Sequence, residues 1–316
     1  MANMQEVRIV CVVVTFNRLA KLKKAIDAYE KQSMPFDTLV IVDNHSTDGT
    51  EQYLEEWGKS NSKLFNKHVI HLQENRGGSG GFYEGERYAM TLNPDWIFVA
   101  DDDAYPELNM ISKVCKYVKS HNTKDVSAIC SSVVSTDGGI SLGHRARYSV
   151  SMFGFFDVKP VGEEEYKQEE FNCSFFSYVG TFMNVCKLKE VGLVNPNFFI
   201  YSDDAEHSLR LGNVGEIICL PYICVSHDSG VENESNTTNM IVSWRDYYLI
   251  RNQIYMLRLH FPLTLPRMIY VFLKSVIREN AKKRDVYYSA IFDGIFGRLR
   301  LNNVYKPGWT LKNQDI

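Results

Sequence analysis

Residues 8–14 read RIVCVVV, a run of mostly β-branched apolar side chains that begins at Arg8. A run of this kind, without polar alternation, is typical of a strand buried on both faces of a parallel sheet. A second run, WIFVA at residues 96–100, is followed directly by three aspartates. Around these two runs, other apolar runs alternate with segments whose apolar residues recur at helical spacing. The alternation predicts an α/β fold with a doubly wound, mostly parallel sheet and helices on both faces.

Most of this pattern lies in the first 130 residues. Pro106 suits the first turn of a helix, so we expect one to begin there. The predicted strands are 8–14, 38–42, 68–72, 96–100 and 126–130, and the predicted helices are 19–29, 48–57, 79–90 and 106–120. Ligands of open α/β sheets bind beyond the carboxyl ends of the strands, so functional residues should directly follow strands.

The pattern weakens after residue 130. Residues 131–175 are predicted to be an insertion or a flexible loop over the site. Beyond it, the sequence predicts a strand at 176–185, a short helix at 203–211 and a strand at 217–225. From residue 241 the chain reads as helix, broken at Pro262 and Pro266. We therefore expect a catalytic domain over residues 1–240 and a helical region over residues 241–316.

The composition excludes several classes of protein. The chain has 316 residues, of which 45% are hydrophobic and 23% charged, so a disordered or fibrous protein is not expected. Its net charge of −3 gives no support to nucleic-acid binding. Seven cysteines without a CxxC pair predict reduced thiols in a cytoplasmic protein. The N-terminal sequence predicts no signal peptide, and no apolar stretch approaches the ~18 residues of a membrane span.

Charge is distributed unevenly along the chain. Residues 241–316 carry 13 Lys and Arg against 5 Asp and Glu, a balance of +8, which leaves −11 for the first 240 residues. Bases and aromatic residues are interleaved in this region, for example at 244–248 and 267–273. This mixture suits either contact with an anionic membrane surface or plain packing on the acidic body. Peripheral attachment to the inner face of the membrane and formation of a homo-oligomer are both compatible with it.

The three aspartates 101–103 are the first candidate site. Burial of three adjacent carboxylates is costly unless a cation compensates. Alternate residues of an extended segment share a face, so Asp101 and Asp103 can point the same way while Asp102 points elsewhere. Two carboxylates on one side suit Mg²⁺ or Mn²⁺, which in turn carries phosphates. A solvated acidic turn that caps the next helix is the alternative.

Two further motifs follow strands. Residues 43–50, DNHSTDGT, begin with Asp43, whose carboxylate can accept hydrogen bonds from a base or a ribose, although the motif also suits a helix cap. Residues 75–81, NRGGSGG, place four glycines where backbone can approach an anion, with Arg76 able to add a contact to phosphate. A merely flexible loop is the alternative. The motif is neither a Rossmann fingerprint nor a P-loop.

The last two candidates lie in the second half of the body. Residues 201–206, YSDDAE, begin a short helix, and a carboxylate at a helix N-terminus is held ionised, as a base or a metal ligand requires. Plain N-capping is equally compatible. His227 follows a strand, and a lone histidine in this position is more often structural than a ligand.

Taken together and in this order, the motifs resemble the inverting family-2 glycosyltransferases, which have the GT-A fold. The resemblance covers roughly residues 7–225. The NRGGSGGF sequence at 75–82 and the triple aspartate narrow it to the galactofuranosyltransferase branch, whose donor is UDP-galactofuranose. Rhamnosyltransferases, which use dTDP-rhamnose, share much of the pattern. The segment 244–252, WRDYYLIRN, resembles the start of the helical region in this branch.

The resemblance implies a role for each matching residue. It implies a bound Mn²⁺ or Mg²⁺ and Asp204 as the catalytic base. The other implied roles are nucleotide-sugar binding by Thr15, Asn17, Asp43, Arg76, Gly77, Gly78, Asp101 and Asp102, metal binding by Asp101, Asp103 and His227, and acceptor binding by Tyr201, Asp203 and Glu206. Tyr201 stands where some relatives have tryptophan.

These assignments predict a glycosyltransferase that moves a sugar from a UDP-sugar to a hydroxyl group of a glycan or lipid-linked glycan, with inversion. One base and one metal ion suffice for a single in-line displacement. A sugar nucleotidyltransferase is the enzymatic alternative, but Arg18 is the only basic residue that hints at it. A non-catalytic nucleotide-sugar-binding protein is the other alternative, although every expected acidic position is filled. The sequence leaves open the acceptor, the linkage and the number of sugars added.

Overall fold

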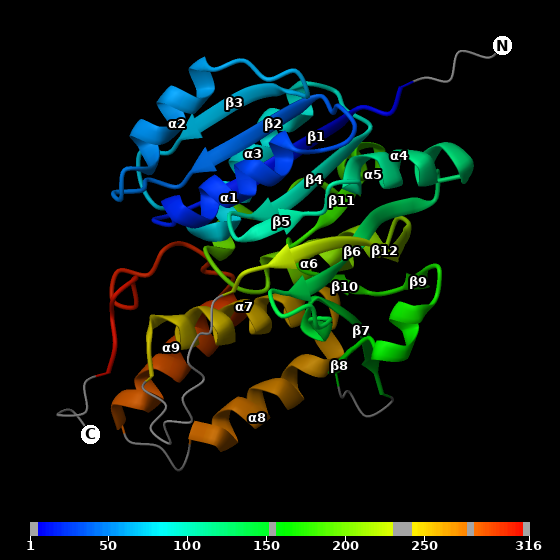
Figure 1. The fold of residues 1–316 in the computed structure, drawn as a ribbon. Helices are drawn as coiled ribbons and strands as arrows, with labels where there is room; N and C mark the ends of the chain where they lie inside the picture. Colours follow the sequence, from blue (N-terminus) through cyan, green and yellow to red (C-terminus); the bar gives the residue numbers. More distant parts are fainter. Residues whose placement is uncertain (1–5, 152–155, 230–241, 277–280, 312–316) are drawn as a thin grey trace.

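A nine-stranded sheet forms the centre of the protein (Figure 1). The computed structural model describes residues 6–151, 156–229, 242–276 and 281–311. The strands of this sheet are β1 (Ile9–Thr15), β2 (Thr38–Asp43), β3 (Asn66–His71), β4 (Trp96–Asp101), β5 (Ala104–Pro106), β6 (Val126–Ser135), β9 (Phe171–Asn172), β11 (Thr181–Asn184) and β12 (Glu216–His227). The predicted α/β class is confirmed.

The sheet runs in the order β3-β2-β1-β4-β11-β6-β12-β5, and β9 pairs with β12. Strands β3, β2, β1 and β4 are parallel, as are β6 and β12. Strand β11 lies between β4 and β6 and is antiparallel to both. The parallel half therefore brings the carboxyl ends of β1, β2 and β4 to one edge, where the predicted motifs lie.

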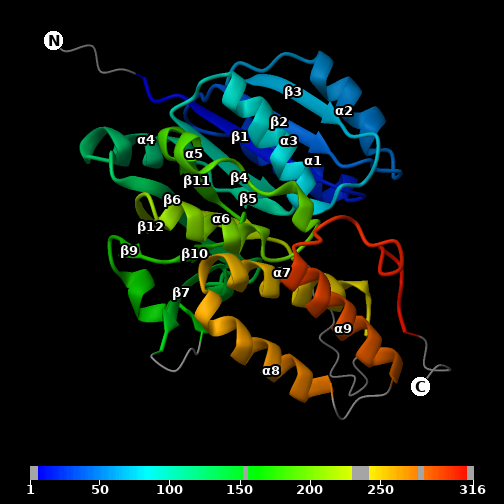
Figure 2. The ribbon, with the colours of Figure 1, turned by 180° about the vertical axis from the view of Figure 1, so that it is seen from behind.

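Helices cover both faces of the sheet, as the two opposite views show (Figures 1 and 2). One core places α1 (Leu19–Glu30), α2 (Thr50–Lys59) and α4 (Met110–Ser120) against one face of the sheet. The other core contains residues of α3 (Gly77–Thr91), α5 (Val185–Val191) and α6 (Asp203–Gly212). The residues of β1 divide between the two cores, so this strand is buried on both faces, as its sequence predicts.

Three predictions of secondary structure are wrong. The helix expected from Pro106 begins at Met110, because residues 104–106 pair with β12 as strand β5. Proline favours extended backbone in the residue before it, which suits this strand. Residues 131–175, expected as an insertion or a flexible loop, are not a loop: they extend β6 to Ser135 and supply most of a second sheet. Its strands are β7 (Arg145–Val150), β8 (Phe156–Pro160) and β10 (Phe175–Phe176).

The predicted strand 176–185 is also divided. Its first residue belongs to β10, its middle part is β11, and Val185 begins α5. The described residues also form four short 3-10 helices: η1 (Leu142–His144), η2 (Glu163–Lys167), η3 (Pro196–Phe198) and η4 (Pro262–Thr264).

The glycine-rich motif forms the first turns of α3, which begins at Gly77, two residues before the helix predicted over residues 79–90. The alternative of a merely flexible loop is wrong. A Cβ added at Gly81 would lie 2.5 Å from Val14 Cγ1, and one added at Gly85 would lie 2.3 Å from Val12 Cγ1. The glycines therefore let the helix backbone lie directly on β1. Close packing of the helix on the sheet thus overrides the low helix propensity of glycine.

Gly85→Ala is expected to destabilise the protein by about 1–3 kcal/mol, because its methyl group would overpack the core against Val12. Gly58→Ala in α2 is the matched control. A Cβ there would meet Val69 Cγ2 at an ordinary 3.7 Å, so the change should be neutral or stabilising by up to ~1 kcal/mol. Urea unfolding of both variants measures the difference. Equal stability of the two would contradict the packing argument.

The C-terminal region is helical, as predicted, over α7 (Trp244–His260), α8 (Leu265–Val276) and α9 (Ala281–Phe296). Two details of the prediction are wrong: Pro266 lies in the first turn of α8 instead of breaking a helix, and residues 297–311 are not helical. These helices lie beside the edge of the body that contains α6 (Figure 2). Their apolar cluster includes Tyr247, Tyr248 and Ile254 of α7 and Val286 of α9, and it extends to Phe199 of the body. The helices are thus packed on the segment that precedes α6.

Candidate active site

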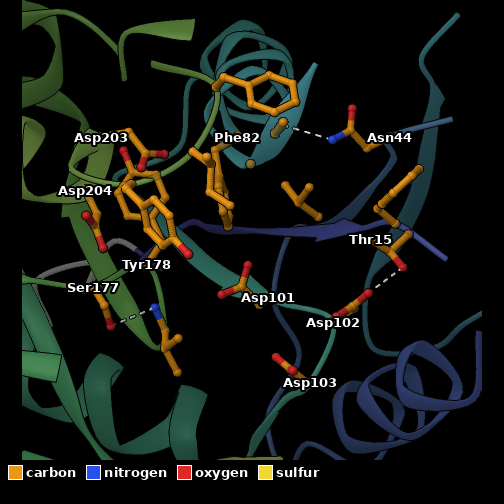
Figure 3. Close-up of a pocket in the computed structure, with 18 of the residues that line it drawn as sticks. Thr15, Asn44, Phe82, Asp101, Asp102, Asp103, Ser177, Tyr178, Asp203 and Asp204 are labelled. Atoms are coloured by element: carbon orange, nitrogen blue, oxygen red, sulfur yellow. Dashed lines mark hydrogen bonds between the residues drawn. The ribbon is translucent and has the colours of Figure 1, made fainter. Parts of the chain in front are cut away.

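A pocket of about 1170 Å³ opens at the carboxyl edge of β1 and β4. Figure 3 shows Thr15 and Asp102 on one side of it, Asp203 and Asp204 on the other, and Asp101 between them. The residues that line it are Val14, Thr15, Phe16, Arg18, Asn44, Asn75, Gly77, Gly78, Phe82, Asp101, Asp102, Asp103, Ser177, Tyr178, Val179, Phe199, Ile200, Tyr201, Ser202, Asp203, Asp204, His227, Ser229, Trp244, Arg245 and Pro307. Five of the predicted segments therefore meet in one cavity.

Asp101 and Asp102 are carboxyls whose surroundings favour the neutral form. Burial, followed by the charges of Asp103 and Asp102, raises the pKa of Asp101 well above its usual range. Burial also raises the pKa of Asp102 to about 6, although hydrogen bonding by Thr15 and the charge of Arg18 oppose the rise. The Thr15 hydroxyl donates to Asp102 Oδ2 at 2.7 Å. A cation in the pocket would restore the charged form of these groups.

Asp103 is held in the charged form. Its Oδ2 accepts hydrogen bonds from Arg18 Nη1 at 2.7 Å and from Lys21 Nζ at 3.4 Å. Burial alone would raise the pKa of Asp103, but contact with His227 and the charges of Arg18 and Lys21 outweigh it and lower the pKa. The side chain of Arg18 is half exposed, so this pairing is open to solvent.

Two of the three predicted metal ligands are brought together. Asp103 Oδ1 is buried without a hydrogen-bond partner in the described chain, and His227 Nε2 lies 3.3 Å from it. The backbone fixes this pair, because Ala104 pairs with His227 across β5 and β12, and the Asp228 amide donates to the Asp103 carbonyl at 2.8 Å. An unpartnered carboxylate oxygen beside an imidazole fits Mn²⁺ or Mg²⁺. Within the described ranges, no three His, Cys, Asp or Glu side chains already form a metal-binding group.

Asp203 and Asp204 begin α6 on the opposite wall. Burial and the charge of Asp203 raise the pKa of Asp204 to about 7, while the Ala205 amide opposes the rise by donating to Asp204 Oδ1 at 2.7 Å. Burial also raises the pKa of Asp203, so the expectation that the helix N-terminus holds these carboxylates ionised is wrong. A carboxylate with a pKa near neutrality can accept a proton from a hydroxyl group and release it again.

Four predicted site residues lie outside the pocket lining. Asp43 is buried, where it accepts a hydrogen bond from the Ser46 amide at 3.0 Å and contacts His71 at 3.1 Å. Asn17 Oδ1 accepts from the Thr47 amide at 2.7 Å. These hydrogen bonds of Asp43 and Asn17 therefore stabilise the turns after β1 and β2.

The other two residues outside the lining are paired elsewhere. Arg76 donates to Glu84 within α3 at 2.6 Å. Glu206 accepts hydrogen bonds from Arg210 at 3.0 Å and contacts His260 of α7 at 3.1 Å. Glu206 thus faces the helical region instead of the pocket.

The pocket also contains residues that the sequence analysis did not select. Asn44 and Asn75 line it beside Gly77, and Asn44 Nδ2 donates to Asn75 Oδ1 at 3.1 Å and to the Gly77 carbonyl at 2.9 Å. Both asparagines belong to the motifs 43–50 and 75–81, so the position of these motifs after strands could have indicated them as pocket residues. Trp244 and Arg245, from the region assigned to surface contacts, close another part of the wall.

Comparison with known proteins agrees with this geometry. Residues 10–192 match the family described as Glycosyl transferase family 2. With the sheet and the pocket, this match defines a glycosyltransferase with the GT-A fold. The chain belongs to glycosyl transferase family 2, as its motifs predicted.

Curated relatives cover part of the chain. It is 31% identical over 126 residues to galactofuranosyltransferase GlfT1 of Mycolicibacterium smegmatis, an alignment that covers 39% of this chain and 40% of that protein. It is 30% identical over 96 residues to GlfT1 of Mycobacterium tuberculosis, with 30% of each chain covered. The chain thus spans 30–40% of the length of these relatives.

Solved structures share the fold at low identity. S. aureus TarS residues 1–349 in complex with UDP-GlcNAc have a TM-score of 0.57 at 14% identity, with 92% of this chain and 82% of that chain covered. GalNAc-T7, solved with UDP, GalNAc and Mn²⁺, has a TM-score of 0.54 at 12% identity, with 80% and 48% covered. In the described residues, no helix is long and apolar enough to cross a membrane.

Proposed function

We propose that the protein is a metal-dependent inverting glycosyltransferase that transfers galactofuranose from UDP-galactofuranose to a hydroxyl group of a glycan or lipid-linked glycan. The observation that carries the proposal is the arrangement of one pocket, in which a carboxylate–imidazole pair and a carboxylate with a pKa near 7 come from different elements. The similarity to GlfT1 supports the choice of donor, and the family match supports the reaction class.

The donor side of the pocket is assigned to β1, β4 and the start of α3. Thr15 and Asn44 border the nucleotide, and Asp43 orients the turn behind Asn44 through the Ser46 amide. Asp102, hydrogen bonded to Thr15, lies near the ribose or the sugar. Gly78, which faces open space, lets the diphosphate approach the N-terminus of α3, where the helix dipole favours negative charge. Gly77 lets the same helix start lie against the Phe199 carbonyl.

Asp103 and His227, which lie together, are the residues that would hold Mn²⁺ or Mg²⁺, and Asp101 of the same motif is the third ligand that the sequence resemblance implies. When bound, the metal ion acts as a Lewis acid on the phosphate oxygen that gains charge as the glycosidic bond breaks. Arg18 and Lys21 surround Asp103 in this structure and place positive charge beside the same position. The family's use of divalent metals supports the assignment.

Asp204 is proposed as the general base. Its carboxylate takes the proton of the acceptor hydroxyl group as that oxygen attacks the anomeric carbon from the face opposite the diphosphate. The new carbon–oxygen bond forms as the bond to the phosphate oxygen breaks, and the configuration at the anomeric carbon inverts. Asp203 lies beside Asp204 in the pocket and is placed to orient the acceptor.

The acceptor side is assigned to Tyr201, Trp244 and Arg245. Aromatic rings such as Tyr201 and Trp244 provide apolar faces for sugar rings, and Arg245 lies 5.3 Å from the centre of the Trp244 ring. The structure places Glu206, the third acceptor residue expected from the sequence, against Arg210 and His260. The proposal therefore replaces Glu206 with Trp244 and Arg245.

The rate should depend on pH through Asp204. Since its pKa in the ligand-free protein is about 7, the base is protonated below that pH and cannot accept a proton. We expect kcat/KM to fall about tenfold per pH unit below pH ~7 and to level off above it. A pH profile of kcat/KM measures this, and a flat profile down to pH ~5 would contradict the assignment.

A donor assay tests the proposed function. Purified protein is incubated with Mn²⁺ and a glycan acceptor and offered UDP-galactofuranose, UDP-glucose or dTDP-rhamnose, with nucleoside diphosphate release as the readout. Release from UDP-galactofuranose alone supports the proposal, and release from dTDP-rhamnose assigns the rhamnosyltransferase alternative. Reaction of a nucleoside triphosphate with a sugar 1-phosphate would indicate a nucleotidyltransferase. Binding without turnover of any donor would indicate a non-catalytic protein.

Contact with a membrane surface or a second copy stays a prediction. The helical region exposes Leu263, Tyr270, Val271 and Phe296, which lie on or next to α8 and α9. Its net positive charge suits anionic lipids. Sedimentation with and without anionic vesicles would distinguish lipid binding from self-association.

A further inference from the structure

The backbone just before the proposed base is strained. Phe199, Tyr201 and Ser202 have φ values of 68°, 65° and 62°. Positive φ is uncommon for residues other than glycine and costs free energy, so it persists only where surrounding contacts enforce it. Here three such residues fall within four positions, directly before Asp203 and Asp204. The segment 198–202 is called the strained turn below.

Two buried side chains of α7 bind the carbonyl groups of the strained turn. Asn252 Nδ2 donates to the carbonyls of Phe198 at 3.1 Å, Ile200 at 2.7 Å and Tyr201 at 2.8 Å. Arg251 Nη2 donates to the Phe198 carbonyl at 2.8 Å. Arg251 Nε also donates to Asn252 Oδ1 at 2.8 Å, which fixes the orientation of the amide. Both side chains are fully buried.

The strained turn is confined on its other side by α3. The Phe199 carbonyl accepts a hydrogen bond from the Ser79 amide at 3.3 Å. A Cβ added at Gly77 would lie only 2.0 Å from the same carbonyl oxygen, so the helix start and the turn are in direct contact. The turn thus lies between α3 and α7. Most of its carbonyl groups accept hydrogen bonds from side chains of α7.

The burial of Arg251 is unusual in its own right. In the part of the chain that the structure describes, its hydrogen bonds go to carbonyl and amide oxygens and to no carboxylate, with Nη1 donating to the Arg300 carbonyl at 3.0 Å. Its guanidinium also lies 4.6 Å from the centre of the Tyr248 ring. Burial of a charge is costly, and a fully hydrogen-bonded polar network makes a structure rigid. The network is therefore suited to fixing a backbone conformation.

We propose that Arg251 and Asn252 are positioning residues for the transfer reaction: they hold the strained turn so that Asp203 and Asp204 face the pocket. This inference rests on the proposed function in taking Asp204 as the base. It makes α7 part of the machinery that orients the base, although neither residue lines the pocket. When the hydrogen bonds are lost, the turn relaxes toward negative φ and the carboxylates at the start of α6 move.

Asn252→Leu tests the proposal, with Gln253→Leu as the matched control. Gln253 is the next residue of the same helix and makes no side-chain hydrogen bond among the described residues. We expect the kcat of Asn252→Leu, measured per UDP-binding site, to fall about 100-fold, because a small displacement of a reacting group lowers the rate by about this factor. The KM for the donor should change less than ~3-fold. Gln253→Leu should change neither. Adding Ser202→Gly to Asn252→Leu should recover part of kcat, because glycine adopts the positive φ without strain.

Hydrogen exchange of the peptide 197–204 gives a readout without substrate. We expect faster exchange in Asn252→Leu than in the wild type and no change in Gln253→Leu. If Asn252→Leu does not fold, Arg251→Lys replaces it, since lysine keeps the charge but loses the forked donors. If Asn252→Leu exchanges hydrogen at the wild-type rate and keeps the wild-type kcat, the proposal is wrong. It is also wrong if the activity of the variant falls only in proportion to its number of UDP-binding sites. If the wild-type protein has no transferase activity, the proposed function is wrong. The exchange experiment would still show whether Asn252 holds the strained turn, because it needs no substrate.

Discussion

Asp204→Asn is expected to lower the rate of sugar transfer by about 10²–10⁴-fold, the usual contribution of a general base. The amide is nearly isosteric with the carboxylate but cannot take up a proton at neutral pH. Asp204 lies across the pocket from Thr15 and Asp102, so the change should leave the affinity for UDP within a factor of ~3 (Figure 3). Single-turnover rates and calorimetric UDP binding measure the two quantities.

The control for this variant is Asp157→Asn, which removes the same charge from an exposed position on β8. It should transfer sugar at the wild-type rate. The assignment of Asp204 fails if Asp204→Asn weakens UDP binding and transfer by the same factor, because the residue would then act in binding. It also fails if the variant keeps the wild-type pH profile.

Asp103→Asn is expected to lower kcat/KM by at least about 100-fold, since metal-ion stabilisation of developing charge contributes several kcal/mol. The change removes the negative charge that faces both His227 and Arg18. Titration of activity with Mn²⁺ should show a much higher half-saturating concentration than in the wild type. The same titration followed by a thermal shift detects metal binding without turnover.

Asp228→Asn is the matched control for Asp103→Asn. Asp228 belongs to the same charged cluster, where it lies 3.8 Å from Lys21 and 3.5 Å from Lys24, but it does not line the pocket. We expect its half-saturating Mn²⁺ concentration to stay near that of the wild type. If both variants shift equally, the effect reflects the overall charge of the cluster, and Asp103 is not a metal ligand.

The sequence could predict which residues meet in the pocket because most of them end strands. Asp101 ends β4 and is followed by Asp102 and Asp103, His227 ends β12, and Asn44 follows β2. Parallel strands present their carboxyl ends at one edge, so position along each strand is enough to bring distant motifs together. The acidic start of α6 joins them from the opposite wall.

The features that could not be predicted depend on contacts between distant segments. Periodicity says that β11 is a strand but not that it is antiparallel between β4 and β6. The sequence predicts a helix over residues 79–90 although glycine has a low helix propensity, and only the close approach of Gly81 to Val14 and of Gly85 to Val12 explains why glycines occupy these positions. Trp244 and Arg245 lie about 40 residues beyond Asp204. The basic charge of their region predicts contact with solvent or lipid, not a place in the pocket wall.

The same limit applies to Arg251 and Asn252. In the sequence they are a polar pair inside a predicted helix, and polar side chains are ordinarily exposed to solvent. Their role depends on three carbonyl groups of a turn about 50 residues earlier, and a turn with positive φ at non-glycine positions leaves no mark in the sequence. Only the assembled structure shows that the two segments meet.

The pairing of β5 with β12 has a consequence for how this protein can vary. Side chains of a strand alternate between its faces, so inserting or deleting a single residue between Cys224 and His227 would turn the imidazole away from Asp103. Strand length on this side is therefore expected to be as constrained as the identity of the proposed metal ligands. In homologous chains, we expect changes of length to accumulate in the connections on the far side of the sheet, while the spacing from the core of β12 to its histidine stays constant.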